Sequence, residues 1–74
     1  MSVYKYITIK EVFENPEIGT YTSYGLKAMR EGKEILTISD VSLNKAFVEG
    51  LARMYTEFQL DPVHLFEVVE DALP

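Results

Sequence analysis

Residues 39–58, SDVSLNKAFVEGLARMYTEF, contain the point at which the hydrophobic pattern of the chain changes its period. Wound at about 100° per residue, the large apolar residues of this stretch fall within about 80° of one another; they are Leu43, Phe47, Leu51, Met54 and Phe58. On the opposite side lie Lys45, Glu49, Arg53 and Thr56. The pattern predicts an amphipathic helix with Ser42 or Ser39 as its N-cap. Gly50 costs a helix about 1 kcal/mol relative to alanine, so it indicates either simple tolerance or a close approach to another element.

The residues before this helix alternate with the period of two that is typical of strands. Residues 3–13 are rich in β-branched and aromatic side chains. Ile7 and Ile9 share one face, and the other face carries Tyr4, Tyr6, Thr8 and Lys10. An Asn-Pro turn precedes a second strand over residues 20–29. Glu31 and Gly32 then predict a tight hairpin to a third, antiparallel strand over residues 33–39.

The residues after the helix, LDPVHLFEVVED (60–71), predict a second helix. Asp61 followed by Pro62 is a helix start, because the carboxylate caps free N–H groups and proline occupies a position that needs no donor. Leu60 and Leu65 flank this start as a hydrophobic staple. The apolar face of the helix consists of Leu65, Val68, Val69, Ala72 and Leu73.

Three strands followed by two helices define the expected architecture, an α+β domain over residues 1–74. A three-stranded antiparallel meander is covered on one face by a helical hairpin, in the order β-β-β-α-α. So few residues cover only one face of the sheet, so the other face is expected to be exposed. Tyr4, Tyr6 and Tyr21 are the candidates for that open face, and the alternative is that the tyrosines fill a small core with their hydroxyls at the surface.

Composition excludes several classes of protein. The chain has no cysteine, which rules out disulfides, thiolate catalysis and zinc–thiolate sites. The net charge is −5: residues 1–41 hold five Lys/Arg and six acids, and residues 42–74 hold two and six. Without a basic cluster, nucleic acid and anionic membrane surfaces are disfavoured partners. No apolar run approaches the roughly 20 residues of a membrane span, so a cytoplasmic location is expected.

The chain also lacks the motifs of common enzymes. It has one histidine for all its serines, no Gly-x-Ser-x-Gly turn and no phosphate-binding glycine loop. We expect neither catalysis nor a cofactor. His64, Glu67 and Asp71 share a face of the second helix and are a weak candidate for a divalent cation, against the alternative of an ordinary solvent face.

Glu70 and Asp71 stand in the last turn of the second helix, where the macrodipole disfavours acids. They are expected to pair with Lys5, Lys10 or Lys27, or to meet a basic group from outside. The leading hypothesis is a non-enzymatic interaction or regulatory module that binds another protein or its own copy through an open sheet face or a strand edge, with Tyr4, Tyr6, Tyr21, Glu70 and Asp71 as candidate contacts. Single-stranded nucleic acid on the tyrosine face is a further alternative.

The chain resembles a family of short bacterial proteins that carry a domain of unknown function. The resemblance covers most of the chain and is strongest in the closing helix, which has the pattern Pro-x-His-Leu-x-x-Val-Val-Glu-Asp. In this sequence the pattern falls on Pro62, His64, Leu65, Val68, Val69, Glu70 and Asp71. The resemblance implies a bacterial cytoplasmic protein and no particular activity, substrate or cofactor.

Overall fold

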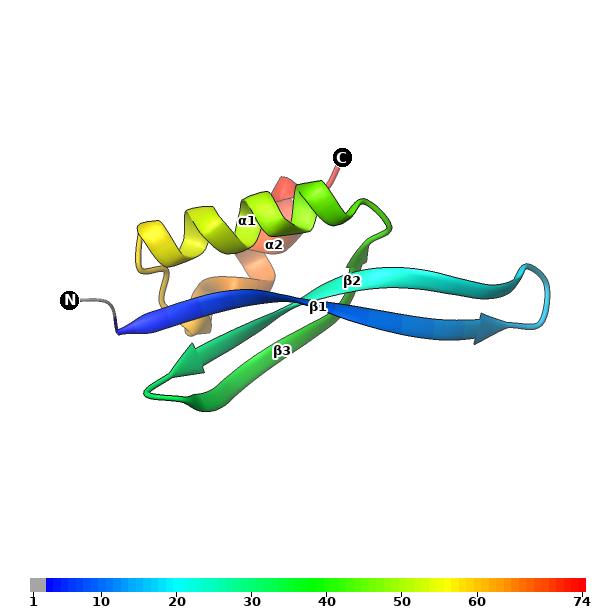
Figure 1. Cartoon of the computed structure of the whole chain (residues 1–74). Coiled ribbons are helices and arrows are strands. Elements are labelled where there is room, and N and C mark those ends of the chain that lie inside the picture. Colours follow the sequence, from blue (N-terminus) through cyan, green and yellow to red (C-terminus); the bar gives the residue numbers. More distant parts are fainter. Residues whose placement is uncertain (1–2) are drawn as a thin grey trace.

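The computed structural model describes residues 3–74, which form three strands followed by two helices (Figure 1). The strands are β1 (Tyr4–Asn15), β2 (Gly19–Arg30) and β3 (Lys33–Ser42). The helices are α1 (Lys45–Glu57) and α2 (Leu65–Ala72), and a short 3-10 turn, η1 (Pro62–His64), leads into α2. The strands pair antiparallel in the order β1-β2-β3, so β1 and β3 are the edges. The predicted α+β class and β-β-β-α-α order are confirmed.

The connection between β2 and β3 is the predicted tight hairpin. Arg30 pairs with Lys33, and the two loop residues Glu31 and Gly32 have φ angles of 51° and 77°. Positive φ at both positions is typical of a type I′ turn, whose twist matches that of the flanking strands. Such a turn fixes the register, because the flanking pair exchanges both of its backbone hydrogen bonds.

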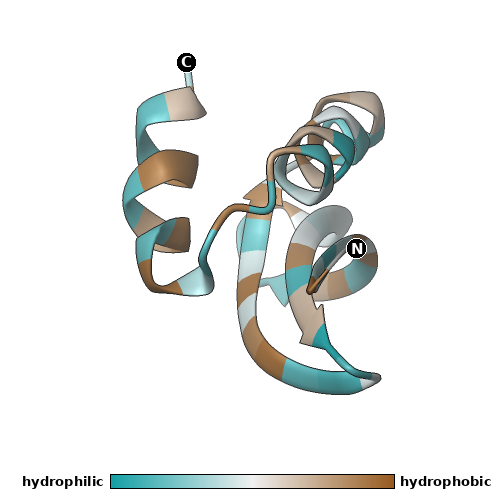
Figure 2. Ribbon diagram, turned by 90° about the vertical axis from the view of Figure 1, so that its left-hand side faces the viewer, coloured by the Kyte–Doolittle hydropathy of each residue, from teal (hydrophilic) through white to brown (hydrophobic). Residues whose placement is uncertain are grey.

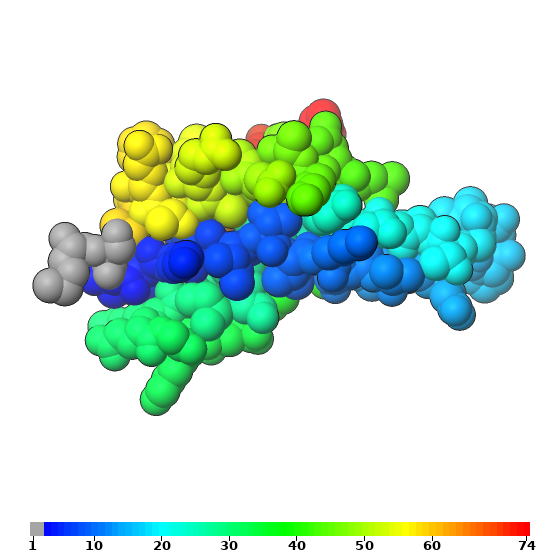
Figure 3. All heavy atoms as spheres, viewed as in Figure 1, coloured from blue at the N-terminus to red at the C-terminus, as the bar shows by residue number. Residues whose placement is uncertain are grey.

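β1 and β2 extend well past the region that the helices cover. Their register runs without a shift from Tyr4–Arg30 to Asn15–Gly19. Figures 1 and 3 show the far part of this hairpin projecting beyond α1 as a two-stranded arm, which we define as residues 11–23. At its tip, Asn15 Oδ1 accepts hydrogen bonds from the backbone N–H groups of Glu17 and Ile18.

The two helical segments begin at capping residues. The N-cap of α1 is Asn44 rather than the predicted Ser42 or Ser39, because β3 continues to Ser42. Asn44 Oδ1 accepts from the Phe47 N–H at 3.1 Å. Asp61 caps the second segment as predicted, accepting from the Val63 N–H at 3.0 Å.

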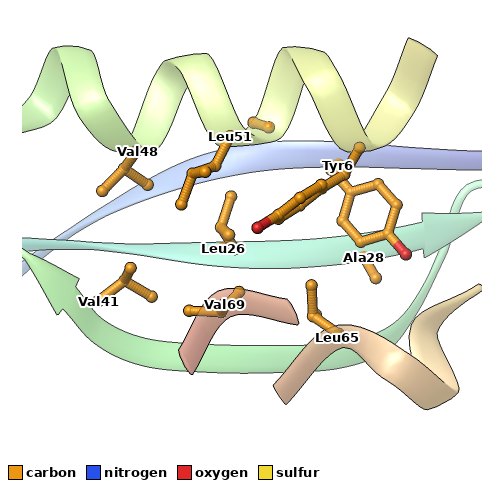
Figure 4. Packing of buried hydrophobic residues seen from close by; sticks show 10 residues of the cluster. Tyr6, Leu26, Ala28, Val41, Val48, Leu51, Leu65 and Val69 are labelled. Carbon is orange, nitrogen blue, oxygen red and sulfur yellow. The ribbon is translucent and has the colours of Figure 1, made fainter. Parts of the chain in front are cut away.

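The core lies between the sheet and the two helices (Figure 4). Strands and helices both contribute buried side chains: Tyr6, Leu26, Ala28, Val41, Val48, Leu51, Ala52, Tyr55, Leu65 and Val69. Figure 2 shows hydrophobic and hydrophilic residues alternating along the strands and around α2, as expected for elements with one buried face. Burying a leucine or valine of this core stabilises the fold by about 1.5–3 kcal/mol.

The buried face of α1 is rotated from the predicted one. Leu43 and Phe58 were expected in the core but are 66% and 75% exposed, and Val48, Ala52 and Tyr55 join Leu51 there instead. The rotation turns Thr56, predicted to face solvent, toward the backbone of β1. The helix thus has two possible apolar faces. The one that faces the sheet also places Thr56 where its hydroxyl accepts a hydrogen bond from the Tyr6 N–H of β1.

The tightest glycine in the fold is Gly25 of β2. A Cβ built on Gly25 would lie against the backbone oxygen of Ile38 and 2.8 Å from Glu11 Oε1. A Cβ on Gly50 would meet nothing within 4 Å. The sequence interpretation that Gly50 marks a close approach is therefore wrong, and its alternative of simple tolerance holds.

Candidate functional site

The uncovered face of the sheet carries the odd-numbered residues of β1 and β2. Their positions follow from the register, in which Lys5 pairs with Met29, Ile7 with Lys27 and Ile9 with Gly25. Paired residues point to the same face, and Tyr6, Leu26 and Ala28 occupy the opposite, covered face. Towards the β2–β3 hairpin, an open pocket of about 430 Å³ has Val3, Tyr4, Lys5, Ile7, Met29, Glu31 and Gly32 as its lining. We call the uncovered side of the sheet, which the odd-numbered residues of β1 and β2 form and which includes this pocket, the open face.

The charged side chains on and beside the open face include Lys5, Lys27, Glu31 and Glu34. Lys27 Nζ lies 3.5 Å from Glu34 Oε1, and both side chains are substantially exposed. Within residues 3–74 this is the one ion pair, so Lys5 at the pocket has no carboxylate partner there. Lys5 therefore stands without an ion pair at a mostly apolar pocket, whose lining also includes the acid Glu31.

A polar cluster joins the base of the arm to the end of β3, and no sequence motif signals it. Glu11 accepts hydrogen bonds from Ser39 Oγ at 2.6 Å and from the Asp40 N–H at 3.1 Å. Asp40, whose φ of 54° bends the strand, accepts in turn from the fully buried Ser23 hydroxyl. Both carboxylates thus have internal donors, and their role is to hold the arm against β3. Burial and the negative charge of Asp40 raise the pKa of Tyr21, whose hydroxyl also reaches that carboxylate.

Tyr21, one of the predicted contact residues, lies half-buried on the open side of the arm. Its ring stacks on Phe13, its cross-strand partner, with centroids 5.5 Å apart and an interplanar angle of 29°. Such pairs stabilise a two-stranded ribbon, which is marginal on its own in water. Tyr21 is therefore positioned by the arm and not by the core.

Tyr6 does not lie on the open face, so the prediction that placed it there is wrong. Tyr4 shares the covered side of β1 and packs against the core, but it also lines the pocket. Tyr6 is 4% exposed and packs edge-on against Tyr55 of α1, with ring centroids 5.7 Å apart. Its hydroxyl donates to the backbone oxygen of Leu60. Tyr4 packs against the core, with Arg30 over its ring. The alternative interpretation, that tyrosines fill a small core, holds for Tyr6, although its hydroxyl bonds the Leu60 carbonyl instead of reaching the surface.

The outer edge of β1 is covered along its first part by side chains of α1 and the residues after it. Gln59 Oε1 accepts from the Tyr4 N–H at 2.9 Å, and Gln59 Nε2 donates to the Tyr4 carbonyl at 2.9 Å. Thr56 Oγ1 accepts from the Tyr6 N–H at 2.9 Å. These contacts imitate the bonds of a neighbouring strand. Beyond Tyr6, no such partner for the outward groups of β1 occurs within the described chain.

The acidic residues of α2 remain exposed. Glu70 and Asp71 were expected to pair with Lys5, Lys10 or Lys27, but none of these pairs forms within the described residues 3–74. The prediction of a helix-to-sheet ion pair is therefore wrong. In the same part of the chain, no group of three His, Cys, Asp or Glu side chains is arranged to hold a metal ion. His64, Glu67 and Asp71 are accordingly not brought together, because His64 belongs to the 3-10 turn before the regular helix.

Neither helix of the described residues has the length and hydrophobicity of a membrane-crossing segment. The fold and its surfaces define a small two-layer α+β protein with a half-covered sheet. The chain belongs to a family of unknown function, DUF6514, whose family model matches residues 1–74. Searches of curated proteins and of solved structures each found no match.

Proposed function

We propose that the chain is a non-enzymatic interaction module of the cytoplasm, which binds another protein through the open face of its sheet. The observation that supports this most directly is the pocket beside Ile7 and Met29 with the unpaired Lys5 at its rim. A mostly apolar depression with a few charged groups in its lining, here Lys5 and Glu31, is typical of the sites at which a protein surface receives an anchoring side chain. The partner chemistry that fits is an apolar side chain followed closely by a carboxylate.

The rival functions have less support from the geometry. Binding of single-stranded nucleic acid was an alternative for a sheet face carrying tyrosines, but Tyr6 lies on the covered face. Base stacking needs exposed aromatic rings in basic surroundings, and the net charge of the chain is −5. Cation binding at α2 requires three ligands that do not converge. Protein binding is therefore the proposal that the pocket of the open face supports best.

Comparative capture tests the proposal. A photo-reactive amino acid is introduced at Met29 on the open face, and as a matched control at Val63, which is 77% exposed on the helical side. After irradiation in cells, we expect a discrete adduct from position 29 and none from position 63. Lys5→Glu, combined with the photo-reactive residue at 29, should abolish the adduct if the partner supplies a carboxylate. Equal labelling at both positions, or none at either, contradicts a binding site on the open face.

A further inference from the structure

The edge of β1 beyond Tyr6 is the longest regular strand edge that the described chain leaves unpaired. The hairpin register directs the backbone groups of odd-numbered residues of β1 to β2 and those of even-numbered residues outward. The contacts of Gln59 and Thr56 with Tyr4 and Tyr6 confirm this assignment. Backbone groups of the next even residues therefore point outward as well; these residues are Thr8, Lys10, Val12 and Glu14.

The other edge of the sheet is less suited to pairing. Two register shifts interrupt the pairing of β3 with β2, between Tyr24 and Leu26 and between Ala28 and Met29. Irregularities of this kind twist an edge and protect it from further strands. β1 has no shift over its 12 residues, and Val12 is 63% exposed in the middle of the uncovered part. A regular edge with an exposed β-branched residue is a template for strand addition.

The charges along this edge are self-complementary about Val12. Lys10 lies two residues before Val12 and Glu14 two residues after it. When two copies of an antiparallel strand pair about a twofold axis at one residue, positions equally far before and after that residue become opposite partners. Pairing about Val12 thus sets Lys10 of each copy opposite Glu14 of the other. Opposite charges at directly paired positions stabilise a ladder.

Neighbouring registers lack this match. Centring the axis on Lys10 or on Glu11 sets two like charges directly opposite each other, which destabilises strand pairing. Centring it on Phe13 sets Val12 opposite Glu14 and forms no opposite-charge pair. A slip of the register by one residue would instead pair side chains that point to opposite faces of the sheet. The charge pattern therefore selects Val12 as the centre.

We propose that two copies of this chain associate through antiparallel pairing of the β1 edges centred on Val12, forming one continuous six-stranded sheet. The occupant of the free edge is thus a second copy, whose Lys10 and Glu14 complete the charge pairs. The segment from Lys10 to Glu14 supplies about six backbone hydrogen bonds, two for each of three narrow pairs. The proposal stands on the strand edge alone, and the open face stays free for the partner of the proposed function.

Charge reversal tests the interface. Such a small interface predicts weak association, with a Kd on the order of 100 µM. Sedimentation equilibrium of the wild-type chain up to millimolar concentration should therefore show a monomer–dimer equilibrium. Lys10→Glu and Glu14→Lys should each weaken self-association by about tenfold or more, because each turns both attractive pairs into repulsive ones. An equimolar mixture of the two variants should form a heterodimer at least as tight as the wild type, since all pairs are then opposite in charge. Circular dichroism establishes that both variants fold.

Cysteine cross-linking tests the register independently, because the chain contains no cysteine of its own. In the proposed dimer the two copies of position 12 face each other with Cα atoms about 5.5 Å apart, within disulfide range. Val12→Cys should therefore form a disulfide-linked dimer about tenfold faster or more than Ile18→Cys, placed at the 70% exposed turn of the arm. A strictly monomeric wild-type chain at millimolar concentration, an unrestored mixture, or equal cross-linking of the two variants overturns the proposal. Met29→Lys, which disrupts the open face, should leave the dimer intact.

Discussion

The side-chain amide of Gln59 pairs with the backbone of Tyr4 as a neighbouring strand would. Its Oε1 accepts from the Tyr4 N–H and its Nε2 donates to the Tyr4 carbonyl, both at 2.9 Å, and Oε1 also accepts from the Val3 N–H at 2.6 Å. Gln59 holds a φ of 52°, a backbone conformation that favours glycine after a helix. The side chain offsets that cost because it satisfies three backbone groups of the sheet edge.

Replacing Gln59 by glutamate should destabilise the fold by about 1–3 kcal/mol, because a carboxylate cannot donate to the Tyr4 carbonyl and leaves that group without its partner. The free energy of unfolding, measured with urea, checks this. Val63→Glu adds the same charge at a nearby exposed position and should change stability by less than about 0.5 kcal/mol. If both variants unfold at the same urea concentration, the amide contact contributes nothing beyond charge.

Two core tyrosines that touch each other should respond in opposite ways to loss of their hydroxyls. The Tyr6 hydroxyl donates to the Leu60 carbonyl, whereas the buried Tyr55 hydroxyl has no partner within the described residues. Tyr6→Phe should therefore cost about 1 kcal/mol, and Tyr55→Phe should be neutral or slightly stabilising, because it removes an unpaired buried polar group. Urea unfolding of the two variants side by side gives the comparison. A larger loss from Tyr55→Phe would show that its hydroxyl is satisfied.

These tyrosines also predict how stability depends on alkaline pH. Burial, followed by the negative charge of Asp61, raises the pKa of Tyr6 to about 12 from 10.0, and burial raises the pKa of Tyr55. Above pH 10 the unfolded chain releases protons that the folded chain retains, so the free energy of unfolding falls as the pH rises from about 10 towards 12. The contribution is fully present below pH 10. Urea midpoints at pH 9 and pH 11.5 measure the fall, and Tyr6→Phe should show a smaller one.

Much of the fold can be predicted from local patterns, because strand alternation, the Glu31-Gly32 turn and the Asp61-Pro62 helix start each act over a few residues. The faces of the elements cannot be predicted in the same way. In β1, one side carries Ile7 and Ile9 and the other Tyr4 and Tyr6, so both sides are apolar enough to be buried. The choice depends on which side meets the helices, and that is a tertiary effect.

The candidate surfaces show the same division. The edge contacts of Thr56 and Gln59 join residues about fifty positions apart in sequence, and a polar residue on a helix ordinarily indicates solvent. Nothing in the sequence distinguishes Thr56 from an exposed threonine. The charge pattern of Lys10, Val12 and Glu14 is visible in the sequence, but it acquires a meaning only once β1 is known to be an edge strand.

Replacing glycine by alanine should have opposite effects at Gly25 and at Gly50. Gly25→Ala should destabilise the fold by about 3 kcal/mol, because the added methyl group would meet the Ile38 backbone oxygen and the Glu11 carboxylate. The backbone oxygen belongs to the paired strand β3, so it cannot move away without breaking the hydrogen bonds between the strands. Gly50→Ala should stabilise it by about 1 kcal/mol, because the methyl group meets nothing and the helix interior gains a better helix former. Thermal unfolding by circular dichroism measures both, with the same change in composition in each variant. Since Gly25 brings β3 and the Glu11 side chain close together, its substitution should also loosen the arm, seen as faster amide hydrogen exchange in residues 11–23 than in the Gly50→Ala protein. If the two variants were equally stable, the Ile38 backbone oxygen and the Glu11 carboxylate would not obstruct a methyl group at position 25.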